Sequence, residues 1–123
     1  MGEEQLMRSR WVKRLGPAIP RWYNVRMGKL PDVEMAGAYK VILGYADLIY
    51  IQDDIVNIVE FKVRDFRGAV GQLLSYRQDF YKTPEFAPYY SLPVLLRIVA
   101  SRHDDSALLL AMNEGISYEF YNG

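Results

Sequence analysis

Cysteine is absent from this chain of 123 residues, and histidine occurs once. Without thiols the protein cannot form disulfides, thiolate nucleophiles, iron–sulfur clusters or thiolate zinc sites, and a single histidine excludes His-His metal sites. Any metal ion must therefore be held by oxygen ligands or by His103. The position of His103, directly before two aspartates, is typical of a solvated loop.

Long apolar runs are also missing. No run approaches the roughly eighteen residues needed to cross a bilayer, and the amino terminus lacks the basic start and apolar stretch of a signal peptide. We therefore expect a soluble, cytoplasmic protein. The chain also contains no glycine-rich phosphate loop and no Gly-x-Ser-x-Gly elbow, which argues against nucleotide hydrolysis and esterase chemistry.

The chain has no net charge, because 15 basic residues balance 15 acidic ones, but the charges are unevenly distributed. Residues 1–30 contain two glutamates against seven basic residues, which are Arg8, Arg10, Lys13, Arg14, Arg21, Arg26 and Lys29. This asymmetry is compatible with a basic surface for a polyanion, with Arg8 as a candidate contact to substrate. It is equally compatible with a surface helix whose charges only maintain solubility.

Half of the residues are apolar, so the chain can form one compact core, but its length leaves no room for a second one. We predict a single domain over residues 1–123.

Two runs rich in β-branched and aromatic residues, 46–51 and 56–63, flank the segment Gln52-Asp53-Asp54-Ile55. This pattern predicts a β-hairpin with a two-residue turn. The turn fixes the register, so that Ile49 lies opposite Ile58.

The same register places Asp47 directly opposite Glu60, with side chains about 5 Å apart. Because strand side chains alternate, Lys62 shares the face of Glu60 and Phe61 points the other way, and Asp47 continues the apolar face of Ile49. Two carboxylates beside an apolar core are destabilising unless something compensates them, and Mg²⁺ or Mn²⁺ bound by oxygen ligands is the simplest compensation. Alternatively, this is a surface strand on which Glu60 and Lys62 are solvated or paired.

These residues resemble the motifs of the PD-(D/E)xK nuclease superfamily. Gly44-Tyr45-Ala46-Asp47 is similar to the first motif, although it departs from the literal Pro-Asp, and Val59-Glu60-Phe61-Lys62 is similar to the second. Gln72-Leu73-Leu74-Ser75-Tyr76 resembles the Gln-x-x-x-Tyr motif of the RecB-like branch. The small size is also similar to that of archaeal Holliday-junction resolvases.

The resemblance implies a metal site made by Asp47, Glu60 and the backbone carbonyl of Phe61. It also implies that Gln72 and Tyr76, which lie four residues apart on one helix face, position the nucleic acid. Lys62 would orient or help deprotonate the attacking water, or stabilise negative charge on the phosphate.

Residues 3–15 read as a helix in which Met7, Trp11 and Leu15 recur at four-residue steps. Glu4 is centred on this stripe and Glu3 is not, so Glu4 is the better candidate for an inward acidic residue. Many members of the superfamily carry a glutamate on the first helix as an additional metal ligand. Both glutamates would also complement the helix dipole without any function.

The remaining elements complete an α/β fold. We predict strands near residues 21–27, 92–100 and 116–121, and helices over 66–82 and from Asp104 or Asp105 to Met112. The segment 33–39 is ambiguous, the strand after it starts near Val41, and Glu34 is a secondary acidic candidate that we expect to be solvated. The order α-β-β-β-α-β-α-β with a mixed central sheet matches a restriction-endonuclease-like, three-layer core.

Two hypotheses from different classes follow. The first is a nuclease that depends on Mg²⁺ or Mn²⁺ and hydrolyses phosphodiester bonds of DNA, as an endonuclease or an exonuclease. The second is a nucleic-acid-binding or scaffolding module that keeps the nuclease fold without turnover. In the first case we expect a homodimer, which doubles the surface available to a duplex, with an interface near Tyr89-Tyr90-Ser91 and residues 116–121. These aromatic residues could also simply close the core.

Overall fold

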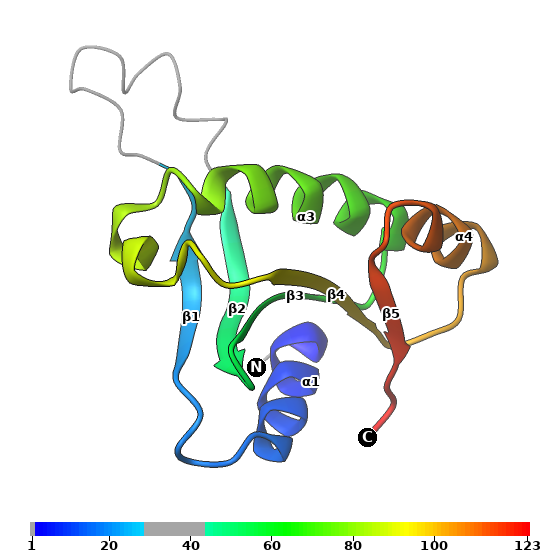
Figure 1. Cartoon of the computed structure of the whole chain (residues 1–123). Coiled ribbons are helices and arrows are strands. Elements are labelled where there is room, and N and C mark those ends of the chain that lie inside the picture. Colours follow the sequence, from blue (N-terminus) through cyan, green and yellow to red (C-terminus); the bar gives the residue numbers. More distant parts are fainter. Residues whose placement is uncertain (1, 29–43) are drawn as a thin grey trace, which may run out of the picture.

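A five-stranded sheet lies between two layers of helices (Figure 1). The computed structural model describes residues 2–28 and 44–123. The strands are β1 (Arg21–Arg26), β2 (Tyr45–Gln52), β3 (Ile55–Lys62), β4 (Val94–Ala100) and β5 (Ser117–Phe120), and they lie side by side in this order. The helices are α1 (Glu3–Trp11), α3 (Phe66–Phe80) and α4 (Asp105–Asn113), with 3₁₀ helices η1 (Val12–Arg14) and η2 (Pro84–Tyr89).

The β2–β3 hairpin has the predicted register. Asp53 and Asp54 have φ angles of 54° and 61°, and two consecutive positive φ values define the turn that matches the twist of the flanking strands. Ile49 pairs with Ile58, as predicted from the position of this turn. A hairpin register depends on the residues of the turn itself, which explains why the sequence was sufficient here.

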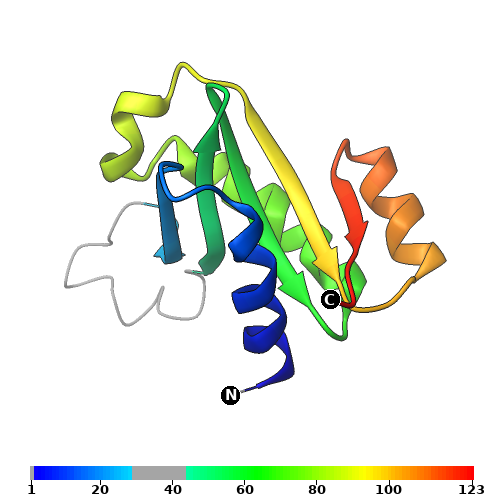
Figure 2. The same cartoon turned by 90° about the horizontal axis from the view of Figure 1, so that it is seen from below.

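The sheet is mixed, as predicted. β2 pairs antiparallel to both β1 and β3, whereas β4 pairs parallel to β3 and β5 pairs parallel to β4. The crossover from β3 to β4 is made by α3, followed by η2, which was not predicted. Phe86 of η2 is fully buried and packs edge-on against Trp22 of β1. Figure 2 shows η2 after the carboxy-terminal end of α3, beside β1.

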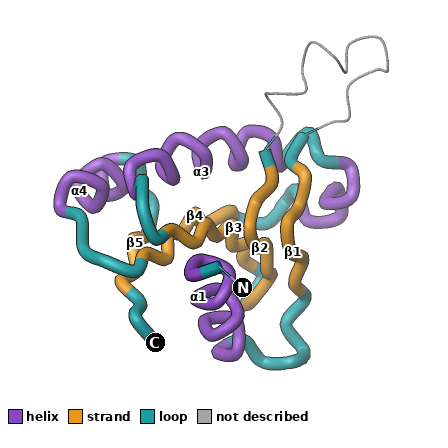
Figure 3. The backbone as a smooth tube through the Cα atoms, turned by 180° about the vertical axis from the view of Figure 1, so that it is seen from behind, coloured by secondary structure: helices purple, strands orange, loops and turns teal. Residues whose placement is uncertain are grey.

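Two separate cores lie on the two faces of the sheet. The α3-side core is built around Ile49, Ile58, Leu73, Phe80 and Ile98. The α1-side core is smaller and contains Met7, Trp11, Leu48, Tyr50, Val59, Phe61, Val63 and Val99. Figure 3 shows α1 on the face of the sheet opposite α3 and α4.

The ends of the elements agree with the sequence to within a few residues. Asp104 caps α4, since its Oδ1 accepts a hydrogen bond from the Ala107 amide at 2.9 Å. The predicted strand near Val41, the segment 33–39 and the secondary candidate Glu34 lie outside the described residues. Within residues 2–28 and 44–123, no helix combines the length and apolar character needed to span a bilayer.

Candidate active site

Asp47 and Glu60 lie where β2 and β3 separate. The regular pairs of these strands end at Leu48 and Val59, one residue before the two carboxylates. Beyond that point, hydrogen bonds from backbone amides to side chains replace the backbone pairing between the strands. Glu60 Oε1 accepts a hydrogen bond from the Asp47 amide at 3.1 Å, and Asp47 Oδ2 accepts one from the Phe61 amide at 2.8 Å. Each carboxylate is therefore anchored to the opposite strand, and the two predicted acidic residues do come together.

The direction of Asp47 differs from the prediction. Ile49 belongs to the α3-side core, but Asp47 lines a cavity beside α1, on the other face of the sheet. The alternation is interrupted in both neighbouring strands at this level. Asn24 and Asp47 are omitted from the otherwise continuous pairs of β1 and β2, and Asn24 has a left-handed φ of 50°. Sequence alternation could not reveal this irregularity, because it depends on two strands that are distant in the chain.

The cavity beside α1 has a volume of about 260 Å³ and is lined by Glu4 and Arg8 from the helix and by Asp47 and Phe61 from the strands. Arg8 is held in place, since its Nη1 donates a hydrogen bond to Asn24 Oδ1 at 2.9 Å. Glu4 and Arg8, the two helical residues chosen from the sequence, therefore share one cavity with Asp47.

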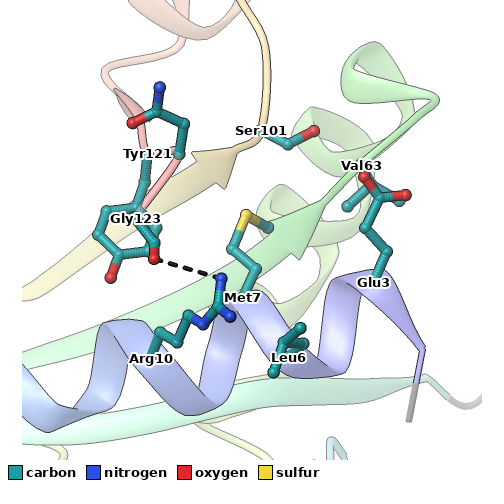
Figure 4. Close-up of a pocket in the computed structure, with 9 residues that line it drawn as sticks. Glu3, Leu6, Met7, Arg10, Val63, Ser101, Tyr121 and Gly123 are labelled. Carbon is teal, nitrogen blue, oxygen red and sulfur yellow. Dashed lines mark hydrogen bonds between the residues drawn. The ribbon is translucent and has the colours of Figure 1, made fainter.

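Glu3 lies elsewhere. It lines a second cavity of about 220 Å³ with Met7, Arg10 and Val63, next to the carboxy-terminal segment. Figure 4 shows this cavity, in which Arg10 Nη1 donates a hydrogen bond to the Gly123 carbonyl at 3.4 Å. Of the two glutamates on α1, Glu4 is the one beside the carboxylate pair, as the helical stripe predicted.

Glu60 is the most strongly perturbed acid of the site. Its side chain is buried, which raises its pKa to about 8, and the nearby charge of Asp47 contributes to this rise. The hydrogen bond from the Asp47 amide and the charge of Lys62 act in the opposite direction but do not offset the burial. Glu60 is thus a carboxylate whose ionised form lacks sufficient compensation from the protein.

Asp47 and Glu4 show the same tendency. Burial is the main cause that raises the pKa of each, and Asp47 contributes further to the rise at Glu4. Lys62 and Arg8 lower both pKa values without restoring the usual range. Three acidic groups with raised pKa values in one place are typical of a functional site, although structural networks can produce them too.

Lys62 and Tyr76 complete the surroundings of the pair. Lys62 ends β3, is half-buried, and acts electrostatically on all three acidic groups. Tyr76 of α3 is buried, and its hydroxyl donates a hydrogen bond to the Tyr45 carbonyl at 3.1 Å. Burial and then the charges of Glu60 and Asp47 raise the pKa of Tyr76, so the phenol stays neutral. Gln72 lies one helical turn earlier and is exposed.

The oxygen donors at this site suit a hard divalent cation, because carboxylates with raised pKa values gain stability when a cation replaces their protons. Asp47, Glu60 and Glu4 are the groups that would hold it, with the Phe61 carbonyl nearby. Across the part of the chain that the structure describes, however, no three acidic, histidine or cysteine side chains are arranged closely enough to hold a metal ion. Backbone hydrogen bonds direct one oxygen of each carboxylate in the pair towards an amide.

Asn24 is the residue of this site that the sequence analysis did not identify. Its side chain fixes Arg8, and its backbone interrupts the β1–β2 pairing beside Asp47. The signal in the sequence was weak. Asparagine tolerates the left-handed conformation better than most residues, but asparagine also occurs in strands whose backbone is regular.

The predicted dimer interface is partly occupied by contacts within the chain. Tyr89 packs against Trp22, and the Tyr90 hydroxyl donates a hydrogen bond to the Thr83 carbonyl at 2.6 Å. Phe120 on the edge strand β5 remains 41% exposed and stacks on His103. The homodimer remains a prediction.

No protein-family model matches the chain, and no curated protein sequence matches it. Solved structures do. A repair endonuclease from Pyrococcus abyssi aligns with 98% of this chain and 48% of its own, with a TM-score of 0.60 and 16% identity. EndoMS in complex with double-stranded DNA aligns with 98% of this chain and 45% of its own, with a TM-score of 0.60 and 16% identity. Protein VC1899 from Vibrio cholerae aligns with 95% of this chain and 29% of its own, with a TM-score of 0.55 and 19% identity.

At these identities the matches show the fold. The chain has the restriction-endonuclease-like α/β fold that the sequence predicted, in the order α-β-β-β-α-β-α-β around a mixed five-stranded sheet. It spans less than half the length of the repair endonuclease and of EndoMS.

Proposed function

We propose that the chain is a divalent-metal-dependent nuclease that hydrolyses phosphodiester bonds of DNA. The observation that carries this proposal is the pair formed by Asp47 and Glu60, which are anchored across the gap between two strands and have raised pKa values next to Lys62. The likeness of the fold to a repair endonuclease and to EndoMS, which was solved with double-stranded DNA, supports the same substrate class.

Each residue has a role in the proposal. Asp47 and Glu60 bind Mg²⁺ or Mn²⁺ together with the Phe61 carbonyl, and Glu4 adds a further oxygen. A bound divalent cation supplies Lewis-acid chemistry at a phosphate oxygen. Lys62 orients the attacking water or stabilises negative charge on the phosphate, because its ammonium acts electrostatically on all three acidic groups.

The substrate contacts come from both helical layers. Arg8, fixed by Asn24, offers a guanidinium to a phosphate at the cavity beside α1. Gln72 and Tyr76 act from α3. The hydroxyl of Tyr76 already binds the Tyr45 carbonyl, so we assign Tyr76 the tasks of packing against the strand and holding the start of β2.

Digestion of plasmid and oligonucleotide DNA in Mg²⁺ or Mn²⁺ tests the proposal. We expect the unmodified protein and the exposed control Glu114→Ala to cleave, and Asp47→Ala and Lys62→Ala to lose cleavage. Activity that survives both substitutions at the site would overturn the assignment. In a protein that cleaves DNA, cleavage of four-way junctions compared with cleavage of linear ends would separate structure-specific from end-directed activity.

Metal binding can be tested separately by isothermal titration. We expect Mn²⁺ heat in the unmodified protein that decreases in Asp47→Asn and Glu60→Gln. Unchanged heat in both variants would place the metal site elsewhere. Thiophilic metals should gain no advantage, because the site has oxygen ligands only.

One observation favours the second hypothesis, a nucleic-acid-binding module without turnover. Backbone amides already satisfy one oxygen of each carboxylate in the pair, which stabilises the site without a metal ion. Tight DNA binding without cleavage in any divalent metal would support this alternative.

The homodimer is part of the nuclease proposal, and the exposed edge strand β5 with Phe120 is the surface we assign to it. Sedimentation at micromolar concentration tests the assembly. A species of about 14 kDa alone, the mass of a single chain, would remove this part of the proposal.

A further inference from the structure

A third cavity lies at the opposite end of α1 from the carboxylate pair. It has a volume of about 220 Å³ and opens between the carboxy-terminal end of α1 with η1 and the strands β2 and β4. We call it the arginine cavity, and its lining residues are Trp11, Arg14, Leu15, Tyr50, Gln52 and Arg97. None of these residues is acidic.

The arginine cavity carries an excess of positive charge. Arg14 and Arg97 share a single carboxylate, that of Glu119 on β5. Arg14 Nη1 donates to Glu119 Oε2 at 2.5 Å, and Arg97 Nη1 donates to Glu119 Oε1 at 3.2 Å. Glu119 Oε2 also accepts a hydrogen bond from Trp11 Nε1 at 2.9 Å. One negative charge therefore faces two guanidinium groups, and one positive charge is left uncompensated.

Arg97 has an unused hydrogen-bond donor as well. Its Nε is buried and has no acceptor among the described residues. A buried donor without an acceptor is costly, and in native proteins such a donor commonly binds a water, an ion or a ligand. Arg97 therefore combines an excess charge with donor capacity that the protein leaves unsatisfied.

The rest of the lining is also suited to an anion. Tyr50 contributes a phenol close to Arg97; burial raises the pKa of Tyr50, and the positive charge of Arg97 lowers it without offsetting the burial. Gln52 contributes a neutral amide at the end of β2. Arg14 lies over the Trp11 ring, with 5.0 Å between its guanidinium carbon and the ring centroid, which restricts the side chain without neutralising it.

We propose that the arginine cavity binds a phosphate group of the nucleic-acid backbone, with Arg14 and Arg97 as its two cationic contacts. The proposal deepens the proposed function and rests on it for the identity of the polymer. Arg8, at the carboxylate pair, bonds to Asn24 of β1, whereas Arg14 bonds to Glu119 of β5, at the other edge of the sheet. A strand that contacts both arginines would therefore cross over α1.

Fluorescence anisotropy with a labelled single-stranded oligonucleotide in EDTA tests the cavity without any cleavage. We expect Arg14→Gln to weaken binding about tenfold and to reduce the slope of log affinity against log salt by about 0.7, the value for one phosphate contact on a single strand. Lys13→Gln is the matched control. It removes the same charge from the same 3₁₀ turn, and both side chains are exposed, but Lys13 does not line the cavity. Equal losses in Arg14→Gln and Lys13→Gln would overturn the proposal.

Trp11 provides a second readout that requires no nucleic acid. In a Trp22→Phe background Trp11 is the only tryptophan, and it lines the arginine cavity. We expect its fluorescence to change in a saturable way with inorganic phosphate, and the change to be lost in Arg14→Gln and Arg97→Gln but kept in Lys13→Gln. No response to phosphate and no Arg14-dependent oligonucleotide binding would together exclude an anion site.

The two sources of phosphate, and the two proposals, can be separated. Arg14-dependent binding of an unphosphorylated oligonucleotide assigns the cavity to an internal phosphodiester. Dependence that appears only with a 5′-phosphorylated strand assigns it to a terminal phosphate. If either occurs in a protein that never cleaves DNA, the cavity assignment stands and the nuclease proposal fails. If Arg14→Gln and Lys13→Gln bind DNA equally well, and the unmodified protein cleaves DNA, the nuclease proposal stands and the cavity assignment fails.

Discussion

Carboxylates near the two ends of α1 have opposite charge surroundings. At the amino-terminal end Glu4, Asp47 and Glu60 share little positive charge, and burial raises their pKa values. At the carboxy-terminal end a single carboxylate, Glu119, accepts bonds from two arginines and a tryptophan. The amino-terminal end of α1 therefore has an excess of acid nearby, and the carboxy-terminal end an excess of base.

This difference distinguishes a carboxylate that stabilises the fold from carboxylates that destabilise it. A salt-bridged carboxylate such as Glu119 contributes to stability, because its removal leaves guanidinium groups without a partner. Buried carboxylates next to one another oppose folding, and a protein that retains them commonly uses them. The opposite charge balance at the two ends is what a polyanion that approaches a cation site would require.

Substitution of Lys62 by methionine should produce the largest effect. We expect a loss of about 10²- to 10³-fold in DNA cleavage, the usual cost of removing one preorganised group that stabilises charge in the transition state. The melting temperature should change little, because Lys62 is only half-buried. Cleavage rates measured with Mg²⁺ check this prediction, with the exposed Lys82→Met as the control. A similar loss in both variants would indicate a general effect of charge.

Glu60 should make stability depend on pH. Its folded pKa of about 8 lies above the usual value of 4.5, so between these limits the folded state holds a proton that the unfolded state releases. Stability must then decrease as pH rises through this window, by up to about 1.4 kcal/mol per pH unit from this one group. We expect Glu60→Gln to have a flatter profile and to be more stable than the unmodified protein at pH 8.

Urea unfolding in EDTA from pH 5 to 9 measures this profile, and Glu114→Gln, at an exposed site, should keep the original slope. Asp47→Asn should also leave the melting temperature equal or higher, since the amide oxygen can still accept the Phe61 hydrogen bond. A stability that increases with pH over this range would contradict the raised pKa of Glu60.

Glu119→Gln should lower the stability of the fold, in contrast to Glu60→Gln and Asp47→Asn. Removal of its charge leaves Arg14 and Arg97 uncompensated, and we expect a loss of about 2 kcal/mol in the free energy of unfolding, because charge-assisted hydrogen bonds of a mostly buried acceptor are lost. The same variant should bind inorganic phosphate more tightly, since the competing carboxylate is neutral. Urea unfolding and the Trp11 titration give the two measurements. A stabilised Glu119→Gln would remove the distinction between the two ends.

Asn24 should give the smallest effect. Asn24→Gly keeps the left-handed backbone accessible but removes the acceptor that fixes Arg8. We expect stability within about 0.5 kcal/mol of the unmodified protein, because the lost bond is exposed. Oligonucleotide affinity should fall a few-fold, and Asn24→Asp, which retains an acceptor, should restore it. An unchanged affinity in Asn24→Gly would mean that Arg8 needs no support from β1.

Local structure and the order of the elements could be predicted from the sequence. The acidic turn after Ile51 fixed the hairpin register, and with it the meeting of Asp47 and Glu60, because a two-residue turn allows one pairing. The apolar stripe of α1 also identified Glu4 over Glu3. These features depend on residues that are close in the chain, for which periodicity and turn chemistry are sufficient.

Features that join distant segments of the chain could not be predicted from the sequence and depend on the folded arrangement. The interruption at Asn24 turns Asp47 towards α1, and it requires β1 and β2 to meet. Glu119 joins Arg14 and Arg97 across separations of 105 and 22 residues, and no local pattern marks it. Burial, which raises the pKa of Glu60, is likewise set by the whole fold, since the dielectric surroundings of a side chain come from every element packed around it.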